Sequence, residues 1–165
     1  MKSGKAFWAG VLGALMMVIV IWVGRTTMAM TMSLAMMLGT MFLTMGSSAW
    51  ILGLFMHLAI GGIIGLVYAW AFEHVAHKAD VWTGVGFGFI NALLAGLVMG
   101  ILPAIHPRFP ESMPAPGYFL WSMGMSGVLV LFLAHLLYGA IVGGMYGPVI
   151  HAPAIADHGS AAPLP

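Results

Sequence analysis

The sequence contains no cysteine, and charged residues make up only 5% of its 165 residues. Without cysteine the chain has no disulfides, no thiolate metal ligands, no thiol nucleophile and no thioether-linked haem. The five basic and four acidic residues leave a net charge of +1, and this balance provides no basic patch for nucleic acid. We therefore expect no nucleic-acid partner.

Apolar residues dominate what is present. Hydrophobic residues supply 62% of the sequence, and the mean hydropathy is +1.06. A soluble domain carries about 25% charged residues, so the composition predicts an integral membrane protein in contact with lipid. A helix needs about 20 apolar residues to cross the hydrocarbon core. Four runs qualify, at residues 6–24, 49–72, 81–105 and 118–146. We expect an all-α bundle of four transmembrane helices, with residues 1–147 as one transmembrane domain.

Two segments outside these runs differ in composition. Residues 26–47 are rich in methionine and threonine. Only a short turn joins them to the first run, and the threonines lower their hydropathy, so we expect an interfacial or re-entrant helix rather than a fifth span. Residues 148–165 form an Ala/Pro-rich tail with too little periodic apolar content to pack by itself. The excess of lysine near the N-terminus and at Lys78 favours cytoplasmic termini.

One pattern occurs twice in the apolar runs, seventy-eight positions apart. Its members are His57, Gly61, Gly65 and Tyr68 in the second run and His135, Gly139, Gly143 and Tyr146 in the fourth. The four-residue spacing places the histidine and both glycines on one helix face. With four spans, both patterns fall on helices of the same direction. This predicts a parallel repeat of two helical hairpins.

Small residues also recur at every fourth position of the third run, from Gly84 to Gly100. In lipid, helices associate through close backbone approach, dispersion and hydrogen bonds rather than through a hydrophobic gain. The second and fourth runs carry similar small-residue faces. We therefore expect these three helices to share one tightly packed centre that contains the two histidines.

His57 and His135 lie near the middle of their runs, where an unpaired polar group is costly. In a structural interpretation, each imidazole forms a hydrogen bond with a neighbouring side chain or a backbone carbonyl. In a cofactor interpretation, the two histidines ligate a haem or a chlorin, and Gly61 and Gly139 leave room for the flat macrocycle. The sequence leaves both open.

A second candidate site combines Met28, Met30 and Met32 with His106. Thioether sulfur is a soft ligand of the kind that binds Cu(I). Methionine-rich runs also serve as flexible apolar packing. Copper binding and packing are thus alternative interpretations of this segment.

No combination of residues points to catalysis. The runs contain no paired carboxylates, and we find no nucleophile with a neighbouring base and no Gly-rich phosphate loop. We expect a non-enzymatic accessory or structural subunit whose small-residue faces and proline-rich loop at 106–117 pack against other membrane proteins or a second copy. A haem- or chlorin-binding subunit is the first alternative, and a Cu(I)-handling protein is the second.

The chain between residues 7 and 147 resembles a family of small bacterial integral membrane proteins classed as a domain of unknown function. The resemblance rests on His-x-x-x-Gly-x-x-x-Gly-x-x-Tyr at 57–68 and His-x-x-Tyr-Gly-x-x-x-Gly-x-x-Tyr-Gly at 135–147. The methionine-rich segment departs from the family pattern. The resemblance implies a bacterial inner-membrane location and no particular activity.

Overall fold

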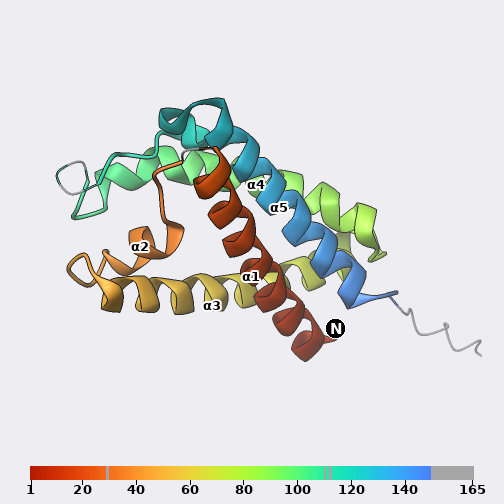
Figure 1. Cartoon of the computed structure of the whole chain (residues 1–165). Helices are drawn as coiled ribbons and strands as arrows, with labels where there is room; N and C mark the ends of the chain where they lie inside the picture. The colour runs from red at the N-terminus through yellow and green to blue at the C-terminus, as the bar shows by residue number, and fades with distance from the viewer. Residues whose placement is uncertain (29, 110, 112, 150–165) are drawn as a thin grey trace, which may run out of the picture.

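The computed structural model describes residues 1–28, 30–109, 111 and 113–149. Its long helices are α1 (Ser3–Thr27), α3 (Ser47–Ala71), α4 (Val81–Ile101) and α5 (Gly124–Tyr146) (Figure 1). Each is long and apolar enough to cross a membrane, which confirms the predicted all-α fold with four membrane helices. Most of the predicted tail at 148–165 lies outside the described residues.

Short irregular turns extend three of these helices. A π-helical turn (Phe72–Ala76) follows α3, a 3-10 turn (Leu102–Ala104) follows α4, and a 3-10 turn (Tyr118–Met123) precedes α5. With these turns, the spans agree with the predicted ranges to within a few residues. Hydropathy alone therefore located the spans.

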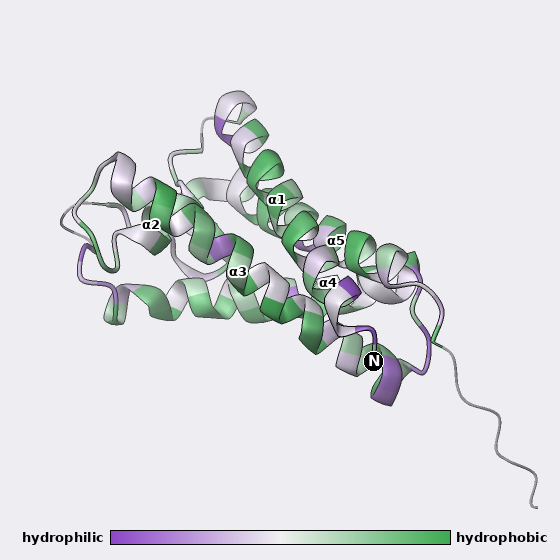
Figure 2. Ribbon diagram, turned by 90° about the horizontal axis from the view of Figure 1, so that it is seen from below, coloured by the Kyte–Doolittle hydropathy of each residue, from purple (hydrophilic) through white to green (hydrophobic). Residues whose placement is uncertain are grey.

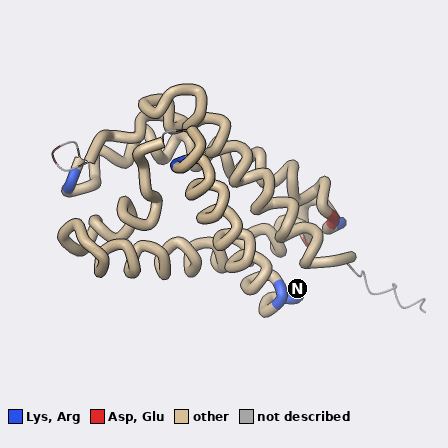
Figure 3. Tube along the Cα trace, viewed as in Figure 1, with Lys and Arg blue, Asp and Glu red and all other residues tan. Residues whose placement is uncertain are grey.

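Charge and exposed apolar surface are distributed as a membrane requires. Lys, Arg, Asp and Glu lie at the ends of the long helices, and the tube between them carries none (Figure 3). Hydrophobic residues run along all the long helices (Figure 2), and many large apolar side chains are exposed; Trp82, for example, is 80% exposed. Lipid gives such side chains an apolar environment without burial inside the protein. The chain is thus a multi-pass membrane protein.

The methionine-rich segment contains one short helix, α2 (Leu34–Gly39). The Ser33 side chain caps it by accepting a hydrogen bond from the Met36 N–H at 3.3 Å. Six residues rise only about 9 Å, so α2 is too short for a fifth span. It packs against α3, where Gly53 allows the backbones of the two helices to approach. An interfacial or re-entrant placement in a membrane stays a prediction.

The helices do not share the single centre that their small-residue faces led us to expect. Instead, α1 packs against both α3 and α5, and α4 packs against α5 (Figure 1). Helices α3 and α5 touch each other at few positions. The expectation was wrong because the glycines of these faces contact different neighbours in pairs: Gly53 of α3 packs against α2, Gly61 of α3 against α1, and Gly139 of α5 against α4.

The repeated glycines make these pairwise contacts. A Cβ atom added to Gly61 would lie 3.0 Å from the Gly10 carbonyl oxygen of α1, and one added to Gly139 would lie 3.0 Å from the Gly88 Cα of α4. Each patterned helix thus packs its glycines against the long helix that precedes it in sequence. These equivalent contacts are those that two hairpin repeats require, while the repeat itself stays a prediction.

The two ends of the bundle differ. At one end, which we call the aromatic end, an aromatic cluster joins α3, α4 and α5; its members are Tyr68, Phe72, Phe87, Tyr138 and Tyr146. At the opposite end, the methionine end, α3 and α4 diverge, and α2 and the loop residues 105–109 and 113–117 lie there (Figure 1). The N-terminus and Pro148 meet at the aromatic end, so both lie on one side of the bundle.

Candidate functional site

The two histidines occupy equivalent places on α3 and α5, and both are 8% exposed. The His57 Nε2–H donates a hydrogen bond to the Ala14 carbonyl oxygen of α1 at 3.1 Å. The His135 Nδ1–H donates to the Leu131 carbonyl oxygen, one turn earlier in its own helix, at 2.8 Å. These bonds agree with the structural interpretation, in which a carbonyl satisfies each buried ring.

The structure does not bring the two imidazoles together around a shared ligand. His57 lines a cavity of about 60 Å³ with Trp50 and Arg25, and His135 lines another of about 40 Å³ with Met30. Sites for ligands of drug size measure about 300–1,000 Å³. Neither cavity holds a macrocycle.

The glycines beside the histidines leave no room either. The α1 backbone and Ala14 fill the space at Gly61, and the α4 backbone fills the space at Gly139. The structure contradicts the role of Gly61 and Gly139 as openings for a flat ring, because close helix packing already uses both positions. Haem or chlorin binding by the histidines stays a prediction without geometric support.

Tyrosines link the histidine-bearing helices. The Tyr138 hydroxyl of α5 donates a hydrogen bond to the Gly61 carbonyl oxygen of α3 at 2.6 Å. The Tyr138 ring also packs edge-on against Tyr68, with centroids 5.5 Å apart. This contact spans 77 positions in the sequence and fixes α5 relative to α3 at the aromatic end.

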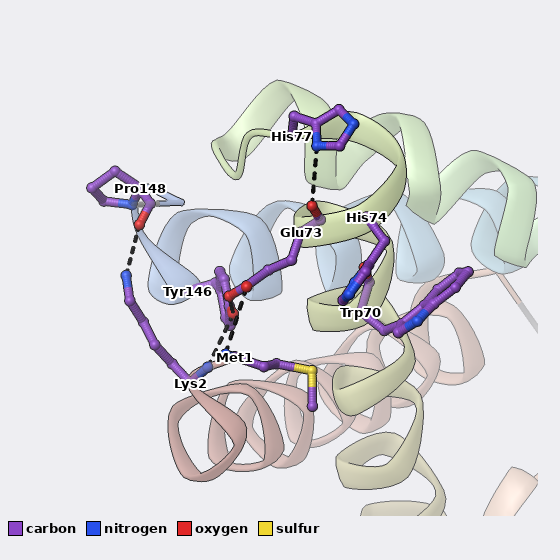
Figure 4. A network of polar contacts seen from close by, with 8 residues as sticks. All are labelled: Met1, Lys2, Trp70, Glu73, His74, His77, Tyr146 and Pro148. Carbon is purple, nitrogen blue, oxygen red and sulfur yellow. Dashed lines mark hydrogen bonds and ion pairs between the residues drawn. The ribbon is translucent and has the colours of Figure 1, made fainter. Parts of the chain in front are cut away.

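The aromatic end also orders polar groups around Tyr146 (Figure 4). Its hydroxyl donates to the Glu73 carboxylate and accepts from the Lys2 backbone N–H at 3.1 Å. The Lys2 ammonium donates to the Pro148 carbonyl oxygen at 2.7 Å. Beside them, the His74 ring stacks on Trp70 with centroids 5.5 Å apart. The cluster joins both ends of the described chain to the last turns of α3 and α5.

The predicted copper ligands are not brought together as one set. Met28 is 49% exposed, whereas Met30 is 4% exposed and packs among Leu120 and Val130. Met32 is only partly buried and lies beside that cluster. Successive members of the Met-x-Met-x-Met run therefore have different surroundings.

His106 has both ring nitrogens engaged. The Arg108 backbone N–H donates to Nδ1 at 3.1 Å, so Nε2 carries the proton and donates to the Met37 carbonyl oxygen at 2.8 Å. No lone pair of this ring is left for a metal. In this structure the ring ties the loop after α4 to α2, and His106 as a copper ligand stays a prediction without geometric support.

A different set of methionines lines a pocket at this end. Met32, Met36, Met37, Met45 and Met113 line a pocket of about 340 Å³. Arg25 at the end of α1, Trp50 near the start of α3, and Phe109 from the loop complete much of its wall. We call this the methionine pocket. It joins segments from both halves of the sequence, because the loop folds back over α2.

The methionine pocket adjoins the two small histidine cavities. It shares Arg25, Ser33 and Trp50 with the cavity at His57, and it shares Met32 with the cavity at His135. The cavities at the two buried imidazoles are therefore neighbours of the methionine pocket. Among the residues that the structure describes, no group of three or more His, Asp or Glu side chains could hold a metal ion.

The sequence did not identify Met113 or Arg25 as members of a site. Met113 is 68 positions from Met45, and nothing local in a proline-rich loop shows where it folds. Arg25 did carry a signal, because it is an isolated cation between an apolar helix and an apolar segment. No family model, no curated protein and no solved structure matches this chain, so the resemblance to a bacterial membrane family stays a prediction.

Proposed function

We propose that this protein is a non-enzymatic binding subunit of the membrane that holds a small, largely apolar molecule in the methionine pocket. The observation that carries the proposal is the pocket itself, with a volume of about 340 Å³ lined by five thioether side chains. Methionine is unbranched and polarizable, so such a wall adapts to ligands of different shape. The volume also lies in the usual range for small-molecule sites.

Photolabelling tests this proposal. The probe is decanol with a diazirine on its alkyl chain, added to the protein in nanodiscs of zwitterionic lipid. We expect labels on peptides from 31–50 and 109–114, in excess of labels on the lipid-facing helices. Met36→Trp and Met113→Trp fill the pocket and should reduce this labelling. Met125→Trp, at a position that is 58% exposed on α5, is the matched control. Unchanged labelling in both filled variants would contradict the proposal.

Cu(I) is the second candidate ligand, because five thioethers share one space. The charge on the wall opposes it: Arg25 is cationic, and none of the described residues that line the pocket is acidic. The copper bound per protein, measured after reconstitution under reducing conditions, shows which of the two methionine sets binds the metal. Replacing Met36 and Met113 by leucine should lower it if the pocket binds copper. Replacing Met28, Met30 and Met32 by leucine tests the set that the sequence predicts. Equal copper content in the wild type and in both variants would contradict copper binding by either set.

The accessory-subunit hypothesis changes in one respect. Its small-residue faces are occupied within the chain, with Gly61 against α1 and Gly139 against α4. The surface left for other membrane proteins is therefore the methionine end and its loop. Recovery of a defined complex after gentle detergent extraction would test this role. Location in a bacterial inner membrane, with cytoplasmic termini, stays a prediction.

A further inference from the structure

We infer that the ligand of the methionine pocket is a single-chain anionic amphiphile whose head group pairs with Arg25. This inference rests on the proposed function and adds the chemical class of the ligand. Its two parts are a carboxylate or phosphate head group and an alkyl chain of about ten atoms. Charge supports the first part and volume supports the second.

Arg25 is a cation whose charge is not neutralised within the described structure. The ion pairs recorded there join the N-terminal amine to Glu73 and Lys78 to Asp80, and both lie at the aromatic end. Arg25 lies in the last turn of α1 and lines both the methionine pocket and the cavity at His57. An arginine stays charged at all working pH values and presents a planar fork that matches carboxylate and phosphate oxygens.

The wall beside Arg25 offers further donors. Thr31 and Ser33 line the same pocket, and each carries a hydroxyl hydrogen. The Ser33 oxygen already accepts from the Met36 N–H, so its own O–H can donate. Anionic oxygens accept several such bonds at once. One side of the pocket therefore suits an anion, whereas a cation would meet a guanidinium there.

The remaining wall suits an alkyl chain. Methionines, Trp50 and Phe109 supply it, and none of these side chains is charged. At about 30 Å³ per non-hydrogen atom, the share of one water molecule in the liquid, a volume of 340 Å³ holds about eleven atoms. That is one chain of medium length with its head group, and it is too small for a two-chain lipid.

Two probes with the same chain and different head groups test the inference. Diazirine-bearing decanoate and decanol are compared in nanodiscs of zwitterionic lipid at a pH where decanoate is ionised. In the wild type, we expect labelling of the pocket peptides by decanoate to exceed that by decanol about tenfold, the usual effect of a charge-assisted hydrogen bond. Arg25→Gln should lower decanoate labelling to the decanol level and leave decanol unchanged, and Arg25→Lys should keep part of the preference.

Arg108→Gln is the matched control, because Arg108 lies at the same end of the bundle, its side chain does not line the pocket, and its hydrogen bond to His106 comes from the backbone N–H, which glutamine keeps. It should keep the full preference for decanoate. Equal labelling by both probes in the wild type, or an equal fall of both in Arg25→Gln, would overturn the inference while the proposed function stands. Absence of pocket labelling by either probe would overturn both. If nanodiscs with phosphatidylglycerol abolish decanoate labelling, a bilayer head group occupies Arg25, and the single-chain inference fails.

Discussion

The aromatic end and the methionine end are built from equally apolar residues and differ in what those residues do. At the aromatic end, rigid rings meet edge to face, as Tyr68 and Tyr138 do at 5.5 Å. At the methionine end, flexible side chains surround a space of about 340 Å³. Apolar composition alone therefore does not determine whether a membrane bundle closes or leaves a pocket; the shape and stiffness of the side chains decide it.

The polar groups at the two ends also differ in whether they have partners within the described chain. At the aromatic end, Tyr146 both donates and accepts, and Glu73 receives its hydrogen bond. At the methionine end, Arg25 lines a pocket in which no described residue is acidic. The first arrangement is complete within the described chain, and the second is the one that we propose binds a ligand. Four substitutions test this comparison.

The largest effect should come from the glycine contacts that hold the hairpins together. Gly139→Val places side-chain atoms against the α4 backbone at Gly84 and Gly88. We expect a loss of about 3 kcal/mol in the free energy of unfolding, at the upper end for overpacked sites. Steric trapping in detergent or bicelles measures it. Gly86→Val is the control, because no atom lies within 4 Å of a Cβ there. Equal losses in both variants would contradict the pairwise packing.

A smaller effect should follow loss of the bond between α5 and α3 at the aromatic end. Tyr138→Phe removes the hydroxyl that donates to the Gly61 carbonyl oxygen at 2.6 Å. The expected loss is about 1.5 kcal/mol in the free energy of unfolding, at the upper end for a buried hydrogen bond inside a membrane bundle. Tyr118→Phe, at a residue that is 56% exposed, should change little. A Tyr138→Phe protein as stable as the wild type would show that ring packing alone fixes the helices.

At the methionine end, the effect should be local. His106→Leu removes the hydrogen bond that ties the loop to the Met37 carbonyl oxygen of α2, and a second bond within the loop, from the Arg108 N–H. We expect amide hydrogen exchange in residues 34–40 to speed up about fivefold, from a loss of about 1 kcal/mol in local stability. Exchange at the aromatic end should not change. His74→Leu, whose ring bonds within its own helix end, is the control and should leave residues 34–40 unaffected.

The smallest effect concerns the start of α4. The Asp80 carboxylate accepts a hydrogen bond from the Thr83 backbone N–H at 2.8 Å, and this bond, with Lys78 nearby, lowers the pKa of Asp80 below its usual value. A lowered pKa stabilises the folded protein above the unfolded-state pKa, and the contribution is lost as pH falls below about 4. Unfolding measured between pH 3 and 6 should show this loss in the wild type and a weaker pH dependence in Asp80→Asn.

Much of the fold could be predicted from the sequence because membrane insertion depends on hydropathy and length. The run at 49–72 became α3 with a π-helical turn, and the segment at 26–47 formed only a short helix. The carbonyl partners of His57 and His135 were among the predicted ones, since a buried ring in a helix usually finds a backbone acceptor.

The partner of each glycine face could not be predicted. A four-residue spacing shows that small residues share one helix face, but it does not show which helix packs against that face. From the sequence, Gly61 could pack against α4 as well as against α1. The methionine pocket could not be predicted from the sequence for a similar reason. Met113 enters it through a loop whose path depends on His106 and Arg108, and neither residue carries a local signal of that contact.

The position of α1 has a consequence for how the protein is made. Of the four membrane helices it is translated first, yet in the described structure one of its flanks packs against α5, which is translated last of the four. During synthesis that flank, with Gly13 against the future place of the Tyr138 ring, must face lipid or the insertion machinery. Assembly is complete only when the final helix arrives, so a chain truncated before α5 should be a substrate for membrane quality control.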